Sequence, residues 1–171
     1  KDGLVCLPVV PKALKAFKEQ CVNVVVITNQ AGVARGYYTE DDVKELHRFM
    51  NELLEKVGAG IDAFYYCPHH PEHGIGKYKI QCHCRKPETG MFEMAEQDFT
   101  VDKSKSWMNG EKLIDIEAGR NYGVSTVLVG TGYGAGVHEE QKKQGDFPDD
   151  LYAEDLLEAY DEINRETAGN L

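Results

Sequence analysis

Residues 21–36 read "CVNVVVITNQAGVARG" and contain the run that decides the fold. Val22 to Ile27 is nearly all β-branched, which is typical of a strand buried on both faces of a parallel sheet. The run ends in Thr28, Asn29 and Gln30 and enters a glycine-bearing loop. Ligand sites of open α/β sheets lie at the carboxyl ends of the strands, so this loop is the first place to look for function.

Helical and extended patterns alternate on both sides of this strand. Thr39 precedes three acidic residues and predicts a helix N-cap, and Gly123 predicts a helix stop. Further strands are expected at 61–66, 104–110 and 125–130, and helices at 11–20, 39–57, 91–99, 111–123 and within 151–167. Residues 131–136 are expected to form a loop and 141–150 a polar, flexible segment. The alternation predicts one α/β domain over residues 1–171, a three-layer α/β/α fold around a mostly parallel sheet.

Composition limits the classes of function. The chain has 171 residues, of which 42% are hydrophobic and 28% charged, which suits a globular domain with a real core. Its net charge of −10 argues against general nucleic-acid binding, which needs a basic surface. No apolar run approaches the ~20 residues of a membrane span. The expectation is a cytoplasmic protein that binds neither nucleic acid nor membrane, with a monomer as the default state.

The five cysteines do not form a secreted disulfide pattern, because their number is odd and two of them are isolated. Cys6 and Cys21 are expected to be small buried hydrophobes. The other three lie among histidines in the stretch 67–87, "CPHHPEHGIGKYKIQCHCRKP". In a reducing compartment, metal binding is the better interpretation of that stretch.

The spacing of this stretch predicts a zinc site. Two close pairs, separated by twelve residues, give a tetrahedral donor set of Cys67, His69, Cys82 and Cys84. Three thiolates and one imidazole close the site, so it would be structural and leave no position for a catalytic water. His70 is the alternative ligand if His69 points away.

Two cations follow the last cysteine of the stretch. A rigid zinc loop would hold Arg85 and Lys86 at the end of a strand, where an anion, and phosphate above all, is the natural target. The alternative is a solvated charge pair.

Five motifs resemble one family. In order they are "VVVITNQAGVARG", "YYCPHHP", "CHCRKPETGM", "NGEKLIDIEAG" and "TVLVGTGYG". Together, from about Leu7 to Gly134, they resemble the D-glycero-D-manno-heptose-1,7-bisphosphate 7-phosphatase family of the haloacid dehalogenase (HAD) superfamily. Histidinol-phosphate phosphatases share the zinc cysteines but have a shorter loop between the pairs. The resemblance implies a Rossmann-like fold without a large cap domain, structural Zn²⁺, and Mg²⁺-dependent phosphoryl transfer through a phosphoaspartate.

The resemblance also implies roles for individual residues. Thr28 and Lys86 would contact the transferring phosphoryl group, Glu111 would bind Mg²⁺, and Asp115 would orient the metal shell. The implied substrate contacts are Asn29, Arg35, Arg85 and Lys112. Each has an ordinary alternative as a strand-end residue, a surface cation or an acid at a helix start.

The sequence departs from the family in two places. The Asp-x-Asp-Gly-Thr motif, which carries the nucleophile and the acid/base, does not occur. Lys1-Asp2-Gly3 could be its tail, with Asp2 as the acid/base, and about 20–30 residues are expected before Lys1. The alternative is an inactive remnant that binds phosphate. Glu111 also stands where the family has Asp, and its extra methylene moves the carboxylate that Mg²⁺ would need in near-ideal geometry.

The leading hypothesis is therefore a phosphatase that removes the 7-phosphate of a small phosphorylated sugar, heptose 1,7-bisphosphate. The alternatives are a histidinol-phosphate or other small phosphomonoester phosphatase, and a phosphate-binding domain without activity. A phosphatase acting on nucleic-acid ends is disfavoured by the charge of −10.

Overall fold

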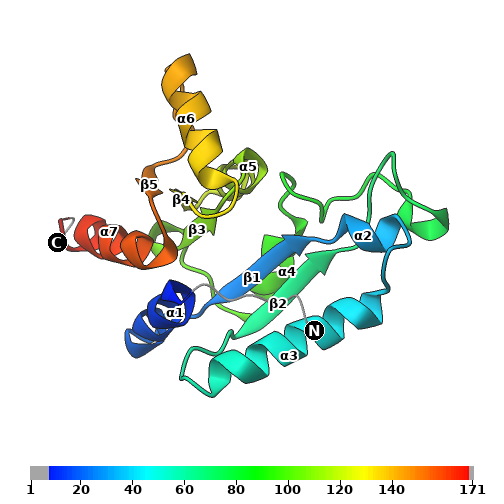
Figure 1. The fold of residues 1–171 in the computed structure, drawn as a ribbon, viewed down its shortest axis with the longest axis horizontal. Helices are drawn as coiled ribbons and strands as arrows, with labels where there is room; N and C mark the ends of the chain where they lie inside the picture. The colour runs from blue at the N-terminus through cyan, green and yellow to red at the C-terminus, as the bar shows by residue number, and fades with distance from the viewer. Residues whose placement is uncertain (1–7, 170–171) are drawn as a thin grey trace. The chain divides into compact units, whose positions relative to one another are not determined.

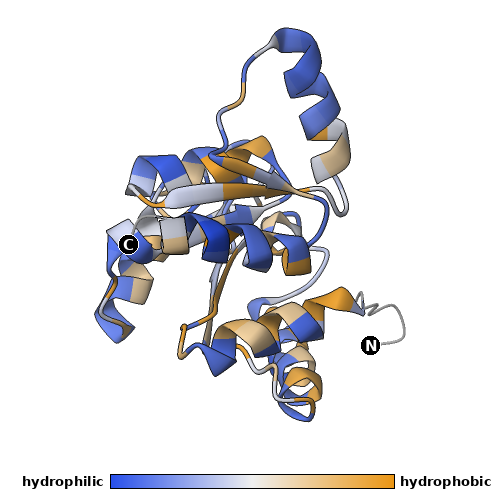
Figure 2. Cartoon of the chain, turned by 90° about the vertical axis from the view of Figure 1, so that its left-hand side faces the viewer, coloured by the Kyte–Doolittle hydropathy of each residue, from blue (hydrophilic) through white to orange (hydrophobic). Residues whose placement is uncertain are grey.

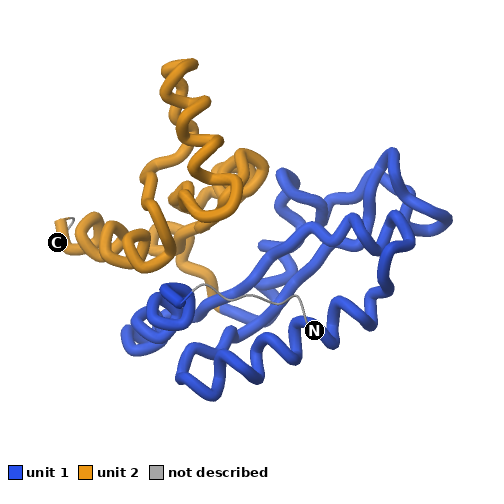
Figure 3. Tube along the Cα trace, viewed as in Figure 1, with its two compact units in different colours: residues 1–99 blue, residues 100–171 orange. Residues whose placement is uncertain are grey.

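The computed structural model describes residues 8–169. The chain divides into two compact units, residues 1–99 and 100–171 (Figure 3). Each unit is built around its own parallel sheet. The strand and helix order is that of an α/β protein, which confirms the predicted fold class.

The first unit holds a two-stranded sheet and its helices (Figure 1). Its elements are α1 (Val9–Glu19), β1 (Val25–Asn29), α2 (Ala31–Ala34), α3 (Glu40–Glu55), β2 (Ala63–Cys67), the 3-10 helix η1 (Gly76–Tyr78) and α4 (Gly90–Asp98). β1 and β2 are parallel and in register from Val25 beside Ala63 to Asn29 beside Cys67. The carboxyl end of β1 therefore lies next to the first cysteine of the Cys/His stretch.

Helices cover both faces of this sheet. On β2, Phe64 and Tyr65 are consecutive, so their side chains point to opposite faces. The ring of His47, on α3, stacks on Phe64 with the centroids 4.6 Å apart. The hydroxyl of Tyr65 donates to Asp98, at the end of α4. α3 and α4 thus lie on opposite faces and give this unit three layers (Figure 1).

The second unit holds a three-stranded parallel sheet in the order β3-β4-β5. Its elements are the 3-10 helix η2 (Lys103–Lys105), β3 (Trp107–Gly110), α5 (Leu113–Tyr122), β4 (Ser125–Val129), α6 (Gly134–Gln144), β5 (Leu151–Ala153) and α7 (Leu156–Gly169). α5 packs closely on β3 and β4 because Gly119 lacks a side chain. A Cβ there would lie 2.7 Å from the Cβ of Met108 and 2.8 Å from the Cγ2 of Thr126.

Several local predictions are confirmed. Thr39 caps α3: its hydroxyl accepts from the backbone N–H of Asp42, and the Asp42 carboxylate accepts from the backbone N–H of Thr39. Gly123 ends α5 in the left-handed conformation, with φ of 96°. The expected strands at 22–27 and 61–66 are observed as Val25–Asn29 and Ala63–Cys67, which begin two to three residues later and end one to two residues later.

The segment 131–153 differs from the prediction. Part of the expected loop (131–136) and part of the expected flexible segment (141–150) belong to α6, and residues 151–153 form β5. The last helix, expected within 151–167, begins at Leu156. α6 buries only Gly134 and Gln141, and it is hydrophilic along most of its length (Figure 2). Within residues 8–169, no helix combines the length and the apolar character needed to cross a membrane.

The prediction for Cys21 is wrong, because this residue is exposed. It lies in the turn after α1 with a φ of 59°, where its N–H donates to the carbonyl of Lys18. The turn carries its side chain away from the core. Cys6 and Asp2 lie outside the described residues.

A carboxylate joins three elements of the first unit. Glu40, at the start of α3, accepts hydrogen bonds from the hydroxyls of Tyr66 on β2 and Tyr78 on η1, both at 2.8 Å. Both bonds lower the pKa of Glu40 below its ordinary value of 4.5, and the bond from Tyr78 has the larger effect. Burial, together with the hydrogen bond to Glu40, raises the pKa of Tyr66 to about 12.

We expect Glu40→Gln to lower the free energy of unfolding at pH 7 by about 1 kcal/mol, because hydrogen bonds to a charged acceptor are replaced by weaker ones. A lowered folded-state pKa stabilises the fold above pH 4.5, and this stabilisation disappears as the pH falls through the lowered value. Urea unfolding at pH 7 and pH 4 should therefore show that the free energy of unfolding falls less on acidification in the variant than in the wild type. Asp41→Asn, in the same helical turn, is the control. Equal acid sensitivity of wild type and Glu40→Gln would contradict the account.

Candidate functional site

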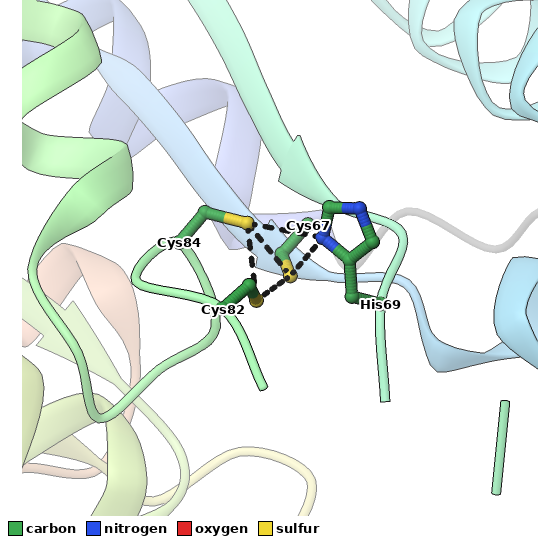
Figure 4. Close-up of side chains that lie close together, drawn as sticks. All are labelled: Cys67, His69, Cys82 and Cys84. Atoms are coloured by element: carbon green, nitrogen blue, oxygen red, sulfur yellow. Dashed lines mark hydrogen bonds between the residues drawn. The ribbon is translucent and has the colours of Figure 1, made fainter. Parts of the chain in front are cut away.

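The Cys/His stretch folds into one compact cluster in the first unit. The sulfurs of Cys67 and Cys84 are 3.1 Å apart, those of Cys82 and Cys84 3.4 Å, and those of Cys67 and Cys82 3.5 Å. The Nδ1 of His69 lies 3.4 Å from the sulfur of Cys84 and 3.8 Å from that of Cys67 (Figure 4). All four donor atoms lie within 4.8 Å of one another.

This cluster fits a tetrahedral metal ion. Metal–sulfur bonds of about 2.3 Å in a tetrahedron place the sulfurs roughly 3.8 Å apart, which is close to the spacing observed. Burial raises the pKa of Cys67, and burial, with the hydrogen bonds that the Cys84 thiol donates to the other two sulfurs, raises the pKa of Cys84. Thiols packed in this way ionise together only when a cation compensates their charge. The cluster could therefore hold a metal ion.

The other histidines of the stretch have different partners. The Nδ1 of His70, the alternative ligand, accepts from the backbone N–H groups of Glu72 and His73 at 3.1 and 3.0 Å. The Nε2 of His83 lies 2.8 Å from Glu93 on α4, whose carboxylate raises the pKa of that imidazole. The structure thus brings His69, and not these residues, to the three cysteines.

The segment after the cluster is attached to the carboxyl end of β1. The side-chain amide of Asn29 forms two bonds with the backbone of Lys86: its Oδ1 accepts from the N–H at 3.0 Å, and its Nδ2 donates to the carbonyl at 3.3 Å. The ammonium of Lys86 donates to the carbonyl of Ile27 at 3.2 Å. Lys86 is therefore held beside the last residues of β1, where Thr28 also lies.

Two arginines add positive charge on this side of the unit. Arg85 donates to the carbonyl of His69 at 3.4 Å, which ties it to the metal-ligand loop. Burial lowers the pKa of His70, and the charges of Arg85 and Arg35 lower it further. The charges of both guanidinium groups therefore reach the same imidazole.

Sequence reasoning missed two residues here, Gln30 and Tyr38. The amide Nε2 of Gln30 donates to the hydroxyl of Thr28 at 3.2 Å, and the hydroxyl of Tyr38 donates to the Oε1 of Gln30 at 2.7 Å. Gln30 directly follows the strand-end residues, and that adjacency is the one sequence signal that could have found it.

In the second unit, Glu111 follows β3 and faces the glycine loop after β4. Its Oε1 accepts from the hydroxyl of Thr131 at 3.1 Å. Gly132, with φ of 59°, leaves the space that the longer side chain needs, because a Cβ there would lie 2.3 Å from the Oε2 of Glu111. One carboxylate suits Mg²⁺, which is commonly bound by one or two carboxylates together with water and phosphate oxygens.

Asp115 and Lys112 shape the turn around this carboxylate. The Oδ2 of Asp115 accepts from the backbone N–H groups of Glu111 and Lys112 at 3.2 and 3.1 Å, so Asp115, which is buried, holds the turn that carries Glu111. The ammonium of Lys112 lies 4.7 Å from the ring centroid of Tyr133. The Oδ1 of Asn109 is buried, and no described residue donates to it.

The predicted site residues therefore form two groups. The first unit brings together the cluster, Lys86, Asn29 and Thr28, with Arg35 and Arg85 nearby. The second unit brings together Glu111, Lys112 and Asp115.

Comparison with known proteins identifies the family. A HAD-hydrolase-like family model matches residues 83–159. The chain is 44% identical over 135 residues to D-glycero-beta-D-manno-heptose-1,7-bisphosphate 7-phosphatase of Haemophilus ducreyi, covering 78% of this chain and 74% of that protein. It is 49% identical over 105 residues to D-glycero-alpha-D-manno-heptose-1,7-bisphosphate 7-phosphatase of Burkholderia mallei, covering 61% of this chain and 56% of that protein.

A solved structure agrees with the sequence comparisons. The crystal structure of D,D-heptose 1.7-bisphosphate phosphatase from B. bronchiseptica, complexed with magnesium and phosphate, matches with a TM-score of 0.80 and 30% identity. The match covers 96% of this chain and 87% of that chain. The described fold, the Cys/His cluster and these similarities together establish that the chain belongs to the D-glycero-D-manno-heptose-1,7-bisphosphate 7-phosphatase family of HAD-like hydrolases.

Proposed function

We propose that this protein hydrolyses the 7-phosphate of D-glycero-D-manno-heptose 1,7-bisphosphate. The observation that carries the proposal is the attachment of the segment after the Cys/His cluster to the end of β1, which holds Lys86 beside Thr28. A cation and a hydroxyl at the carboxyl end of a parallel strand suit a phosphoryl group, whose transfer needs positioning and charge stabilisation. The names of the relatives support the choice of sugar.

In this proposal, the residues of the first unit bind and orient the phosphate. Lys86 neutralises charge on the phosphoryl oxygens, and Thr28 donates a hydrogen bond to one of them. Arg85 and Arg35 contact the sugar or its second phosphate, since both arginines act on the same part of the surface. Asn29, whose amide is engaged by the backbone of Lys86, holds that lysine in place as well as facing the substrate.

Two metal ions belong to the proposal. Cys67, His69, Cys82 and Cys84 would hold a structural Zn²⁺, the metal that three thiolates and an imidazole favour. Glu111 would hold Mg²⁺, with Asp115 fixing the turn and Lys112 contacting substrate. Bound Mg²⁺ supplies charge neutralisation on the phosphoryl oxygens.

The phosphoaspartate route requires a nucleophile that the described residues do not provide. The resemblance places it in an Asp-x-Asp-Gly-Thr motif, which the 171 residues lack, and Asp2 as acid/base lies outside the described part. Residues 1–171 as one phosphatase domain are thus proposed to supply phosphate binding and the two metal sites. Free thiols at the cluster suit the reducing cytoplasm, and a monomer is proposed there.

A substrate panel tests the proposal. The protein as its gene encodes it, loaded with Zn²⁺ and Mg²⁺, is assayed for phosphate release from both anomers of heptose 1,7-bisphosphate, from histidinol phosphate and from a simple phosphomonoester. The proposal predicts the highest kcat/KM for one heptose anomer. Preference for histidinol phosphate would support the histidinol-phosphate phosphatase alternative. Phosphate binding without turnover would support the inactive remnant.

We expect Glu111→Asp to raise magnesium-dependent turnover, because the shorter side chain restores the carboxylate position that octahedral Mg²⁺ favours. The test is kcat as a function of Mg²⁺ concentration. Glu117→Asp, further along α5, serves as the control. A fall in turnover for Glu111→Asp would contradict the assignment and indicate that the contact with Thr131 has adapted the site to the longer side chain.

A further inference from the structure

The hydroxyl of Thr28 is the end of a short hydrogen-bonded chain, Tyr38–Gln30–Thr28. We propose that Gln30 and Tyr38 are positioning residues that orient this hydroxyl so that its proton points toward the phosphoryl group. The inference rests on the proposed function, because it assigns the purpose of the chain to phosphate recognition by Thr28.

The direction of each hydrogen bond from Tyr38 through Gln30 to Thr28 follows from the donors and acceptors of these side chains. A threonine hydroxyl has one proton to donate and lone pairs to accept. The amide N–H of Gln30 occupies the accepting side of Thr28, so the proton of Thr28 must point elsewhere. In the structure, the Thr28 hydroxyl donates to the carbonyl of Asn29 at 3.4 Å, which is a long contact. A hydrogen bond to an anionic phosphate oxygen would be shorter and stronger.

Tyr38 fixes which end of the Gln30 amide faces Thr28. The Tyr38 hydroxyl donates to Oε1 at 2.7 Å, and this bond turns Nε2 toward Thr28. Without it, the amide could rotate by half a turn and present its oxygen to the hydroxyl. An oxygen there would accept the proton of Thr28 and remove it from the substrate.

The backbone holds both positioning residues. The N–H of Gln30 donates to the carbonyl of Cys67 at 2.8 Å, and its carbonyl accepts from Val33 at 3.0 Å. Gly32 leaves room for the ring of Tyr38, since a Cβ there would lie 2.3 Å from two ring carbons. The carbonyl that anchors Gln30 belongs to Cys67, a proposed zinc ligand. The three hydrogen-bonded residues are therefore attached to the end of β2 as well as to the end of β1.

The first test is kinetic and uses the protein as its gene encodes it, with heptose 1,7-bisphosphate. Gln30→Met removes the donor and Tyr38→Phe removes only a hydroxyl, and we expect kcat to fall by about tenfold and about threefold, with KM within about twofold. Gln30→Glu keeps the acceptor for Tyr38 but offers Thr28 an oxygen, and it should lower kcat more than Gln30→Met. Tyr37→Phe, at the neighbouring tyrosine that is 75% exposed, should leave kcat unchanged.

A double-mutant cycle separates orientation of the hydroxyl from general support of the loop. Thr28→Val removes the hydroxyl and keeps the branched shape, so Gln30→Met and Tyr38→Phe should have no further effect on kcat in that background. Equal fold-changes in both backgrounds would overturn the proposal. Melting temperatures of all variants within a few degrees of the wild type, with unchanged metal content, would show that the fold is intact.

A second readout does not depend on turnover. In ¹⁵N NMR spectra, the side-chain amide protons of Gln30 should exchange slowly with solvent in the wild type and quickly in Tyr38→Phe, with Tyr37→Phe like the wild type. Binding of inorganic phosphate, followed by titration, should be weakened by Thr28→Val and by Gln30→Glu. If the wild type fails to hydrolyse the heptose bisphosphate but these NMR results hold, the proposed substrate is wrong and the chain of three residues stands. Unchanged amide exchange in Tyr38→Phe, or unchanged phosphate binding in Gln30→Glu, would overturn the proposed positioning role, whether or not the protein hydrolyses the heptose bisphosphate.

Discussion

Cys82→Ser is expected to abolish zinc binding and to destabilise the first unit more than any other single change considered. The sulfur of Cys82 lies 3.4 and 3.5 Å from the other two sulfurs, and a serine hydroxyl at that place is a poor zinc ligand. Structural zinc contributes about 10–16 kcal/mol of apparent folding free energy in small peptides. We expect at least about 3 kcal/mol of that to be lost here, or roughly 6–12 °C in melting temperature for a protein of this size.

Cys82 is a better position for this substitution than Cys67 because Cys82 is only partly buried. A serine hydroxyl at position 82 is not fully buried, so the loss of stability reports on the metal. The measurements are zinc content by mass spectrometry and thermal unfolding by circular dichroism. Cys21→Ser is the matched control, since Cys21 is free and exposed. One zinc per chain and a wild-type melting temperature in Cys82→Ser would rule out a structural zinc site.

Lys86→Met is expected to lower kcat by about 10²–10³-fold, the usual effect of removing one preorganised charge from the transition state of a group transfer. Methionine keeps the length of the side chain and removes its charge. The backbone bonds to Asn29 use the N–H and carbonyl of residue 86, so they survive the substitution. The change should therefore act on charge and not on the position of the segment.

Phosphate release under saturating substrate measures this effect. Lys79→Met, at an exposed position of the loop between the ligand pairs, is the control and should retain full activity. Zinc content and melting temperature should stay near wild-type values in both variants. A Lys86→Met protein with more than about half of the wild-type kcat would remove this lysine from the proposed mechanism.

The sequence was informative where local pattern and tertiary structure agree. The β-branched run before Thr28 predicted β1, since β-branched residues favour extended strands, but the expectation of full burial was wrong, because all five residues of β1 are only half-buried. Thr39 and Gly123 marked helix ends because capping is local chemistry. The paired spacing of cysteines and histidine predicted the cluster of four, because four ligands must meet around one ion.

Other features depend on contacts that no local pattern records. α6 buries little, so its sequence has no apolar periodicity and resembles a loop. β5 is three residues long and is defined by pairing with β4. The sequence left His69 and His70 as alternatives. The structure places His69 beside the cysteines, while two backbone N–H groups bond to the ring of His70.

Gln30 and Tyr38 show the same limit at the site. Their side chains meet across a turn that depends on the absence of a side chain at Gly32. Glu111 is a related case, since its fit depends on Gly132 and Thr131, about twenty residues further along the chain. Such pairs follow from the packing of loops at strand ends, which composition and spacing do not specify.

The most direct test of the central claim is ³¹P NMR of heptose 1,7-bisphosphate during incubation with the protein as its gene encodes it, loaded with Zn²⁺ and Mg²⁺. The account predicts that the signal of the 7-phosphate disappears as inorganic phosphate appears, while the signal of the 1-phosphate remains. Loss of the 1-phosphate, or no release of phosphate by folded, zinc-loaded protein, would contradict it.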